Sequence, residues 1–324
     1  MEQVLHQLPK LTDPSLLAGL DSRDDAAVYK ISENIAIVQS VDFFPPIVDD
    51  PFTYGEIAVA NAVSDIYAMG GVPLLGLNIV SFPDNLPNTI LTEIINGGAS
   101  KASEAGILVV GGHTIKNDVP LYGMAVTGTL KPGMEITNSS AKPNDVLVLT
   151  KPLGSGILTT AAKADDIESE LLTSCLNVMK ELNDKAASAM RDTGVHACTD
   201  ITGFGLIGHI KEMTESSGLM ANIQINATPF MEGVTDCASA GHIPFGTRQN
   251  FEAITDSVKW ANRMSVEEKL MFCDAQTSGG LLISIGLENL DKLTKNLDLY
   301  GISNYAVIGE MTSRKESSLH ITVN

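Results

Sequence analysis

One helical stretch, residues 61–71 (NAVSDIYAMGG), constrains this chain more than any other part of it. Apolar residues at 59, 62, 63, 66 and 69 recur at the spacing of a buried helix face, and the two final glycines supply a C-terminal stop. Asp65 lies beside that face, where an isolated charge is very costly. Its carboxylate therefore needs a partner, which is either a nearby backbone donor or arginine, or a metal ion.

The sequence around this stretch is strongly acidic. Asp25 opens the apolar run 26–29 and Asp42 closes the run 35–41, so both stand where strands begin or end. Converging carboxylates repel by about 4 kcal/mol per pair at ~4 Å and an effective dielectric constant near 20. Hard cations such as Mg²⁺ or Mn²⁺ make such a cluster tolerable, and Mg²⁺ usually completes its shell with water and substrate phosphates. A metal–nucleotide site is the first hypothesis. Residues 22–71 hold two cations and eight acids, namely Asp24, Asp25, Glu33, Asp42, Asp49, Asp50, Glu56 and Asp65.

Length and charge narrow the class of protein. The 324 residues suffice for about two ordinary domains. A formal charge of −18 argues against nucleic acid or an anionic membrane surface as partner. No basic and apolar leader opens the chain, and no run approaches the ~20 apolar residues of a membrane span, so we expect a soluble cytoplasmic protein. The cysteines form no CxxC pair, which predicts reduced core thiols and no zinc site: Cys175, Cys198, Cys237 and Cys273.

Hydrophobic periodicity predicts a chain of alternating strands and helices, with a domain boundary at residue 150. Within residues 1–20 we expect a short helix that contains Leu5 and Leu8, followed by a break or new start at residues 12–14. The other predicted helices cover the stretch that follows 49–51 and carries Asp65, 88–105, 166–191 and the segment after Gly205. The predicted strands cover residues 26–30, 35–41, 73–82, 106–111, 121–130, 146–150, 195–198, 220–226 and 281–284.

Two glycine-rich segments resemble phosphate-binding loops in their sequence. The strand at 106–111 is expected to end in a flexible turn at Gly111, Gly112 and His113, where backbone amides can approach phosphate. His113 either contacts phosphate or substrate, or ties down its own turn. Residues 203–208 fit the GxGxxG pattern, but no acid follows about 20 residues later, so a dinucleotide site is not expected. No Walker A pattern occurs in the sequence, so an ATP site must be of another kind.

Seven segments, in order over nearly the whole chain, carry a resemblance to a known family: residues 22–28 (SRDDAAV), 42–44 (DFF), 61–71, 111–114 (GGHT), 150–154 (TKPLG), 199–206 (TDITGFGL) and 274–280 (DAQTSGG). The chain resembles the selenophosphate synthetases (selenide, water dikinases). These belong to the ATP-binding superfamily of aminoimidazole ribonucleotide synthetase. The family usually has proline where Ala275 stands, which loosens one turn.

The resemblance implies an α+β or α/β fold of two domains. Residues 1–150 would form an ATP- and metal-binding domain whose mixed sheet makes a barrel in a homodimer, and residues 151–324 an α/β sandwich. The implied activity converts selenide, ATP and water to selenophosphate, phosphate and AMP. The implied ligands of Mg²⁺ are Asp25, Asp65 and Asp200, although Asp200 could instead cap the following helix. The implied nucleotide-binding residues are Ser22, Arg23, Asp24, Asp42, Asp65, Gly111, Gly112 and His113.

One part of the family pattern has no counterpart in the sequence. The family carries a reactive cysteine or selenocysteine and an essential lysine before the Arg-Asp-Asp motif, and neither Lys10 nor any cysteine here stands in that context. We therefore assign no catalytic residue, and expect little selenide-dependent turnover of the chain as given together with metal–nucleotide binding. The alternatives are another superfamily enzyme, such as thiamine-monophosphate kinase or the hydrogenase-maturation carbamoyl dehydratase, and a non-catalytic nucleotide-binding protein.

Overall fold

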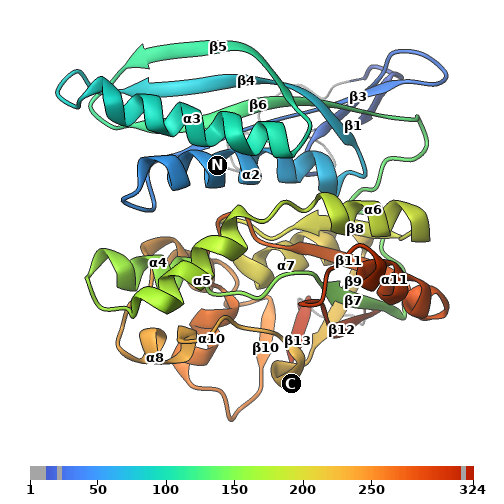
Figure 1. The fold of residues 1–324 in the computed structure, drawn as a ribbon. Coiled ribbons are helices and arrows are strands. Elements are labelled where there is room, and N and C mark those ends of the chain that lie inside the picture. Colours follow the sequence, from blue (N-terminus) through green and yellow to red (C-terminus); the bar gives the residue numbers. More distant parts are fainter. Residues whose placement is uncertain (1–11, 20–23, 315–318) are drawn as a thin grey trace.

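Two mixed β-sheets, each packed against helices, make up the protein. A computed structural model describes residues 12–19, 24–314 and 319–324. In the view of Figure 1 one sheet lies in the upper half and the other in the lower half, and helix α2 (Pro51–Ala68) runs between them. This is the α+β architecture expected from the sequence. We call the part up to β6 the first half and the part from β7 onward the second half.

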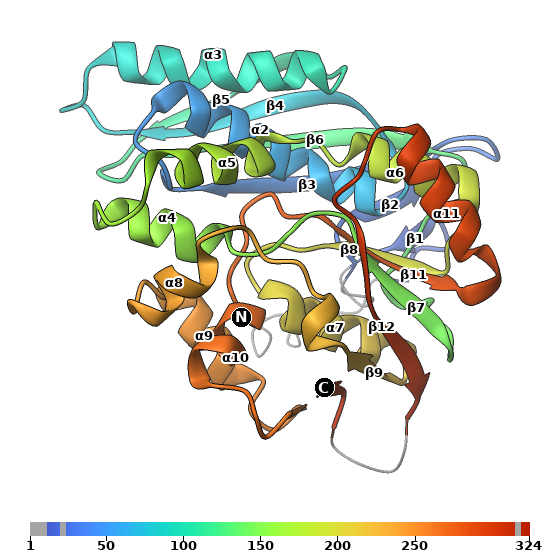
Figure 2. The ribbon, with the colours of Figure 1, turned by 60° about the horizontal axis from the view of Figure 1, so that its bottom comes forward.

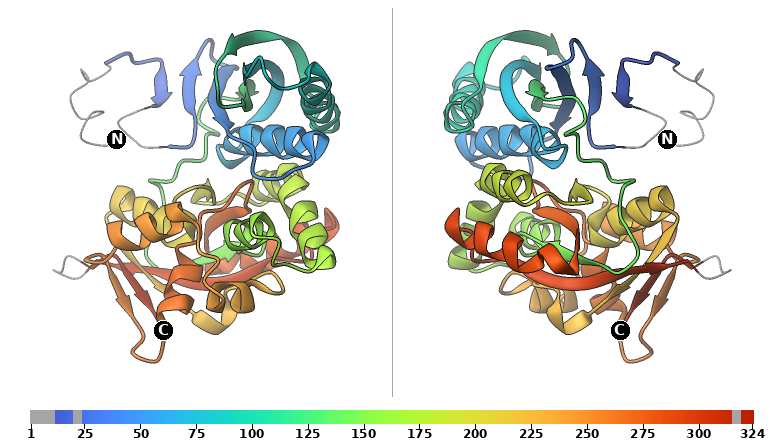
Figure 3. Two further views of the ribbon diagram at one scale, coloured as in Figure 1. Left: turned by 90° about the vertical axis from the view of Figure 1, so that its left-hand side faces the viewer. Right: turned by 90° about the vertical axis from the view of Figure 1, so that its right-hand side faces the viewer.

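The first sheet has the strand order β1-β2-β3-β6-β4-β5, with all neighbours antiparallel except β4 and β5. Helices α2 and α3 (Asn88–Glu104) cover one of its faces (Figures 1 and 3). Along β3, buried Val38 alternates with exposed Val41 and Phe43, as expected of a strand with one covered face. The strands are β1 (Leu16–Ala18), β2 (Ala27–Lys30), β3 (Ala36–Phe44), β4 (Val72–Phe82), β5 (Leu108–Lys116) and β6 (Leu121–Leu130).

The second sheet has the order β10-β13-β9-β12-β7-β11-β8, and is parallel only where β13 meets β10 and β9. Its strands are β7 (Asp145–Leu149), β8 (Ala197–Asp200), β9 (Leu219–Ile223), β10 (Val258–Trp260), β11 (Leu281–Gly286), β12 (Ala306–Ser313) and β13 (Ile321–Val323). Figure 2 shows the helices around this sheet. They are α4 (Ser155–Lys163), α5 (Ser169–Lys180), α6 (Asp184–Thr193), α7 (Gly205–Ser217), α8 (Val234–Ser239), α9 (Phe245–Ala253), α10 (Val266–Phe272) and α11 (Leu287–Leu299), with a short 3₁₀ turn at Ile225–Ala227.

Helix α2 is the element shared by both halves. Pro51 occupies its first turn, and Asp50 caps it by accepting the Thr53 N–H through Oδ2 at 2.8 Å. Gly70, with φ +75°, supplies the stop. Most of the buried apolar side chains of α2 belong to one cluster with Val148 of β7 in the second sheet, so the core runs continuously between the two halves.

The predicted helix over residues 166–191 is wrong, because the chain breaks there into α5 and α6. Glu181 is extended, with ψ 129°, and its carbonyl accepts a hydrogen bond from Lys151 Nζ at 2.6 Å. Asn183 Nδ2 donates to Ser64 Oγ on α2 and to Gly279 O, both at 2.9 Å. These partners are distant in sequence, so local periodicity carries no sign of the break.

The amino-terminal prediction is only partly testable. The short helix predicted around Leu5 and Leu8 lies outside the described residues. After residues 12–14 the chain forms a strand, β1, so the predicted break is found there and a new helix start is wrong. The division at residue 150 stays a prediction. Since β7 pairs within the second sheet, we propose that the division falls before β7, in the breaker-rich segment 131–144. Among the described residues, no helix has the length and apolar character needed to cross a membrane.

Helices α2 and α3 approach closely enough to require glycine at their contact. A Cβ atom added to Gly97 would lie 1.9 Å from the backbone oxygen of Phe52, and one added to Gly98 would lie 1.9 Å from the Tyr122 hydroxyl. Real side chains do not come that near, so a side chain at Gly97 must push α3 away from α2, and one at Gly98 must displace the Tyr122 ring of β6.

We expect Gly97→Ala to lower the free energy of unfolding by about 1–3 kcal/mol, because overpacking displaces backbone at this contact. Urea denaturation measures the change. Ser100→Ala, on the exposed side of the same helix, should stay within about 0.5 kcal/mol of the parent chain. Equal stability of the two variants would show that the glycine contact is not tight.

Candidate metal and nucleotide site

Four carboxylates from four separate elements meet where the halves join. Asp25 precedes β2, Asp42 lies on β3, Asp65 on α2, and Asp200 ends β8. Burial, and then the charge of Asp200, raise the pKa of Asp25 and of Asp65 well above the ordinary value. The same two causes raise the pKa of Asp42 to about 6. Because only neighbouring charges act on one another in this way, the four groups share one location.

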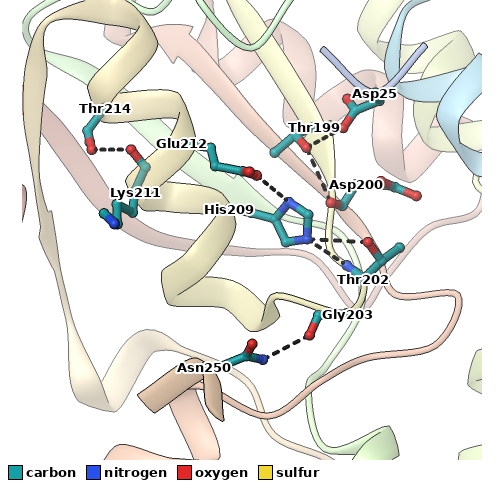
Figure 4. A network of polar contacts seen from close by, with 10 residues as sticks. All are labelled: Asp25, Thr199, Asp200, Thr202, Gly203, His209, Lys211, Glu212, Thr214 and Asn250. Carbon is teal, nitrogen blue, oxygen red and sulfur yellow. Dashed lines mark hydrogen bonds and ion pairs between the residues drawn. The ribbon is translucent and has the colours of Figure 1, made fainter. Parts of the chain in front are cut away.

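Neutral donors hold three of these carboxylates in place. Thr199 Oγ1 donates to Asp25 Oδ1 at 2.7 Å, and so joins β8 to the segment before β2 (Figure 4). Asn61 Nδ2 donates to Asp42 Oδ2 at 2.7 Å. A hydrogen bond from Ser64 lowers the otherwise raised pKa of Asp200. Each bond orients a carboxylate without cancelling its charge.

Asn61 also ties the site to the second half. Its Oδ1 accepts the backbone N–H of Ser278 at 2.9 Å, and it lies one helical turn before Asp65 on α2. Ser278 has φ +54°, which is uncommon for a side chain other than glycine. A backbone strained in this way persists only where its surroundings fix it, and here Asn61 is one of those fixed contacts.

Lys151 is a buried cation near this cluster. Its Nζ donates to the carbonyl oxygens of Glu181 at 2.6 Å and Ser278 at 3.0 Å. Burial lowers its pKa to about 8, while the charges of Glu181 and Asp200 act in the opposite direction. The sequence prediction assigned this lysine no role, although it lies in one of the recognised motifs. It holds the break between α5 and α6 against the loop before β11.

Two carboxylate oxygens of the cluster lack a hydrogen-bond partner. Asp25 Oδ2 and Asp200 Oδ2 are both buried, and neither is satisfied by the described residues. A buried acceptor in that state costs about 1–3 kcal/mol, and more when it is charged. Asp25, Asp42 and Asp65 each keep part of their surface exposed. A bound ligand would give Asp25 Oδ2 and Asp200 Oδ2 the partner that they lack.

A hard divalent cation fits this donor set. Carboxylate oxygens are the ligands that Mg²⁺ and Mn²⁺ prefer. Within the described ranges, no three acidic, histidine or cysteine side chains already close around one point as a finished metal cage. Mg²⁺ does not need such a cage, because it is usually held by one or two carboxylates with water and phosphate as the other ligands. The two unsatisfied oxygens of Asp25 and Asp200 could act as the protein ligands of such an ion.

The other predicted residues of the first half are less closely tied to the cluster. Ser22 and Arg23 lie outside the described residues. Asp24 Oδ1 accepts the backbone N–H of Asn138 at 2.9 Å, and its charge contributes to the raised pKa of Asp25. Asp24 therefore links the segment before β2 to the connection between the halves.

Residues Gly111, Gly112 and His113 do not form the predicted turn. They continue β5, whose residues are exposed throughout, along the edge of the first sheet. The register places Gly112 in one row with Asp42, three strand spacings away, or about 14 Å. His113 is one position further along, so its side chain lies on the opposite face of the sheet. Within one chain, these three residues are not brought beside the acidic cluster.

Two glycine-rich helix starts in the second half differ in how they are capped. Asp274 Oδ2 accepts the N–H groups of Gly156 and Ile157 at 3.1 and 3.2 Å, and so takes the anion position at the start of α4. Helix α7 starts at Gly205 with no side-chain cap, so Asp200 is not the cap that the sequence left possible. The start of α4 is therefore already occupied by a carboxylate of the protein.

Comparison with known proteins gives matches over almost the whole chain. Residues 23–130 match the family described as AIR synthase related protein, N-terminal domain, and residues 142–322 match its C-terminal domain. A selenide, water dikinase from Carboxydothermus hydrogenoformans is 46% identical over 315 residues, covering 97% of this chain and 91% of that protein. One from Caldanaerobacter subterraneus subsp. tengcongensis is 45% identical, covering 99% and 93%.

Solved structures show the same fold at low sequence identity. Thiamine-monophosphate kinase from Stenotrophomonas maltophilia K279a has a TM-score of 0.69 and 15% identity, with 95% of this chain and 91% of that chain covered. A HypE–HypF complex has a TM-score of 0.72 and 18% identity, covering 100% and 95%. These likenesses confirm the expected fold.

The pKa of Asp42 generates a prediction about stability without metal. The unfolded state loses this proton near the ordinary value of 3.8, whereas the folded state keeps it until about pH 6. Protonated Asp42 therefore stabilises the folded state below about pH 4, and this stabilisation is lost as the pH rises through about 6. In EDTA, the free energy of unfolding relative to Asp42→Asn should fall by about 2 kcal/mol between pH 4 and 7. Urea titrations measure this difference, and a pH-independent difference would contradict the shared charge.

Proposed function

The chain belongs to the selenide, water dikinases within the AIR synthase-related family, and from that premise we propose that it uses ATP to convert selenide and water to selenophosphate, with release of AMP and phosphate. The observation that carries the proposal is the carboxylate cluster between the halves, with its two unsatisfied buried oxygens. A polyphosphate is as anionic as this cluster. Only bound cations can bring the two together.

We assign the metal to Asp25, Asp65 and Asp200, with Mg²⁺ or Mn²⁺ as the ion. A bound ion would screen the charge that develops on the phosphoryl groups during transfer. The chain's own part is orientation. Thr199 engages one oxygen of Asp25 and leaves the other for the ion, while Asn61 fixes Asp42 at the edge of the same site. Because these donors are already in place, binding requires little rearrangement.

The cysteines support the absence of a thiol nucleophile from the described part of the chain. All four are buried free thiols. Burial raises the pKa of Cys175 to about 12 and that of Cys198 well above the ordinary value. A thiol becomes nucleophilic as its pKa falls, so neither is suited to attack. Reduced cysteines also support the proposed cytoplasmic location.

Two other functions remain as alternatives. Thiamine-monophosphate kinase shares the fold at 15% identity, which carries no information on substrate. A non-catalytic nucleotide-binding protein would keep the carboxylate cluster but make no product. Nucleotide products separate these possibilities: selenide-dependent AMP supports the proposal, and ADP formed with thiamine monophosphate supports the kinase.

We expect the chain to bind ATP only when Mg²⁺ is present, and Asp65→Asn to abolish that binding because it removes a ligand from the site. Equilibrium dialysis with labelled ATP measures both. Binding that is independent of Mg²⁺, or unchanged in Asp65→Asn, would refute the assigned site.

We also propose a second copy of this chain as partner. The outer face of the first sheet and its edge strand expose large apolar side chains, among them Leu108 at 69% and Val110 at 58% of their surface. An exposed apolar edge strand is a pairing surface, and two identical edges can pair about a two-fold axis. Pairing there would bring Gly111, Gly112 and His113 of one copy toward the other copy, where they could reach its nucleotide.

Val110→Glu should convert the dimer to a monomer, because it places a charge in the middle of the apolar edge. Light scattering coupled to size exclusion measures the mass. Leu287→Glu is the matched control, since Leu287 is 66% exposed at the start of α11 in the second half. A parent chain of monomer mass, or a dimer that survives Val110→Glu, would contradict this surface.

A further inference from the structure

A buried histidine supports the turn that carries Asp200. His209 lies in the early part of α7 and is 5% exposed. Its ring points back to the turn between β8 and α7, where Nε2 accepts the backbone N–H of Thr202 at 3.1 Å (Figure 4). Thr202 is two residues beyond Asp200. The histidine therefore contacts the backbone that places a proposed metal ligand.

The geometry sets the tautomer of this ring. A backbone N–H can only donate, so Nε2 must be the acceptor and carry no proton. The ring proton is then on Nδ1, which faces Glu212 Oε2 at 3.4 Å one turn further along the helix. This is an ion-pair distance and not a hydrogen bond, since Nδ1 has no hydrogen-bond partner among the described residues, but the carboxylate charge favours the ring proton on this side. The contact from Nε2 to the backbone beside Asp200 is an outer-shell contact, and such contacts fix ligand geometry at metal sites.

The rest of the turn is fixed by other contacts, which leaves the Thr202 N–H to His209. Ile201 N–H donates to Gly280 O at 2.9 Å, and Gln276 N–H donates to Thr202 O at 3.0 Å. Asn250 Nδ2 donates to Gly203 O at 2.8 Å (Figure 4). Without the imidazole, one partly buried N–H beside the acidic cluster would lose its acceptor, at a cost of about 1–3 kcal/mol.

The ring of Phe204 lies over His209. Their centroids are 5.6 Å apart, and Phe204 is itself 58% exposed. This aromatic contact covers the imidazole on the side of the turn and separates it from solvent. The hydrogen bond to Thr202 is therefore formed in a place where water competes little for the N–H.

We propose that His209 is a positioning residue of the metal–nucleotide site: its Nε2 fixes the turn that aims Asp200 at the ion. This rests on the proposed function, since it presupposes that Asp200 binds metal. His209 touches neither ion nor nucleotide in this role. Its contribution is the placement of one carboxylate, so its loss weakens metal binding before it weakens the fold.

A pair of amide substitutions tests the role. In His209→Gln the side-chain oxygen can reach the position of Nε2, whereas the shorter side chain of His209→Asn reaches only that of Nδ1. The Mg²⁺ concentration for half-maximal ATP binding, measured by dialysis, should rise about 10–100-fold in the asparagine variant and less than about threefold in the glutamine variant. Hydrogen exchange at the Thr202 amide should accelerate in the asparagine variant alone, with or without metal.

Thr214→Val is the matched control on the same helix. Thr214 is fully buried and its hydroxyl bonds only within α7, to Lys211 O at 2.9 Å (Figure 4). It should leave the Mg²⁺ requirement unchanged.

Three results would overturn the inference: wild-type Mg²⁺ dependence in His209→Asn, an equal loss in His209→Gln, or a loss in Thr214→Val as large as that in the asparagine variant. If the parent chain itself shows no metal-dependent ATP binding, the proposed function fails and this role fails with it. Parent binding with an unaffected asparagine variant defeats the role of His209 alone.

Discussion

Mutual repulsion among four carboxylates is the constraint on which this structure depends. The four come from segments far apart in sequence: Asp25, Asp42, Asp65 and Asp200. The charge of Asp200 raises the pKa of each of the other three. No arrangement chosen for stability alone would gather them, since an amide at any of these positions would avoid the repulsion. The fold opposes that cost with a continuous apolar core around α2, which joins both sheets. Apolar contacts of α2 stabilise the fold, while repulsion among the carboxylates beside this helix destabilises it.

The way the cluster is supported keeps its charge available. Threonine, asparagine and serine donors orient the carboxylates, and these groups add no positive charge. The nearby buried cation, Lys151, is turned toward two backbone carbonyls. A bidentate arginine in the same place would satisfy the carboxylates and close the site to metal. Neutral support from both halves therefore leaves the charge of the cluster uncancelled by the groups that orient it.

Local pattern in the sequence was enough to predict α2 and most strands of the first sheet and to single out Asp25, Asp42 and Asp65, whereas Asp200 was singled out by the family resemblance alone. These features depend on neighbours within a few residues: Asp50 caps its own helix, and Gly70 ends it. The failures all involve distant partners. The break after α5 is fixed by Lys151 and by the contacts of Asn183, from segments tens of residues away. The role of His209 had no sequence signal, because a histidine on an apolar helix face looks the same whether or not a backbone N–H from the preceding turn reaches it.

Three glycine-rich segments of this chain look like phosphate loops, and none of them behaves as one in the described structure. Residues 111–112 continue an edge strand, and residues 154–156 lead into a helix start that Asp274 already occupies. The turn at 203–205 is clamped by His209 and Asn250. At Gly112, Gly154, Gly156 and Gly205, glycine serves close packing, because a side chain there would strike backbone or a neighbouring side chain. Among the described residues of one chain these segments offer no phosphate loop, which is why we propose that cations held by the carboxylates recognise the polyphosphate instead. Bound cations would also reconcile the formal charge of −18 with so anionic a substrate.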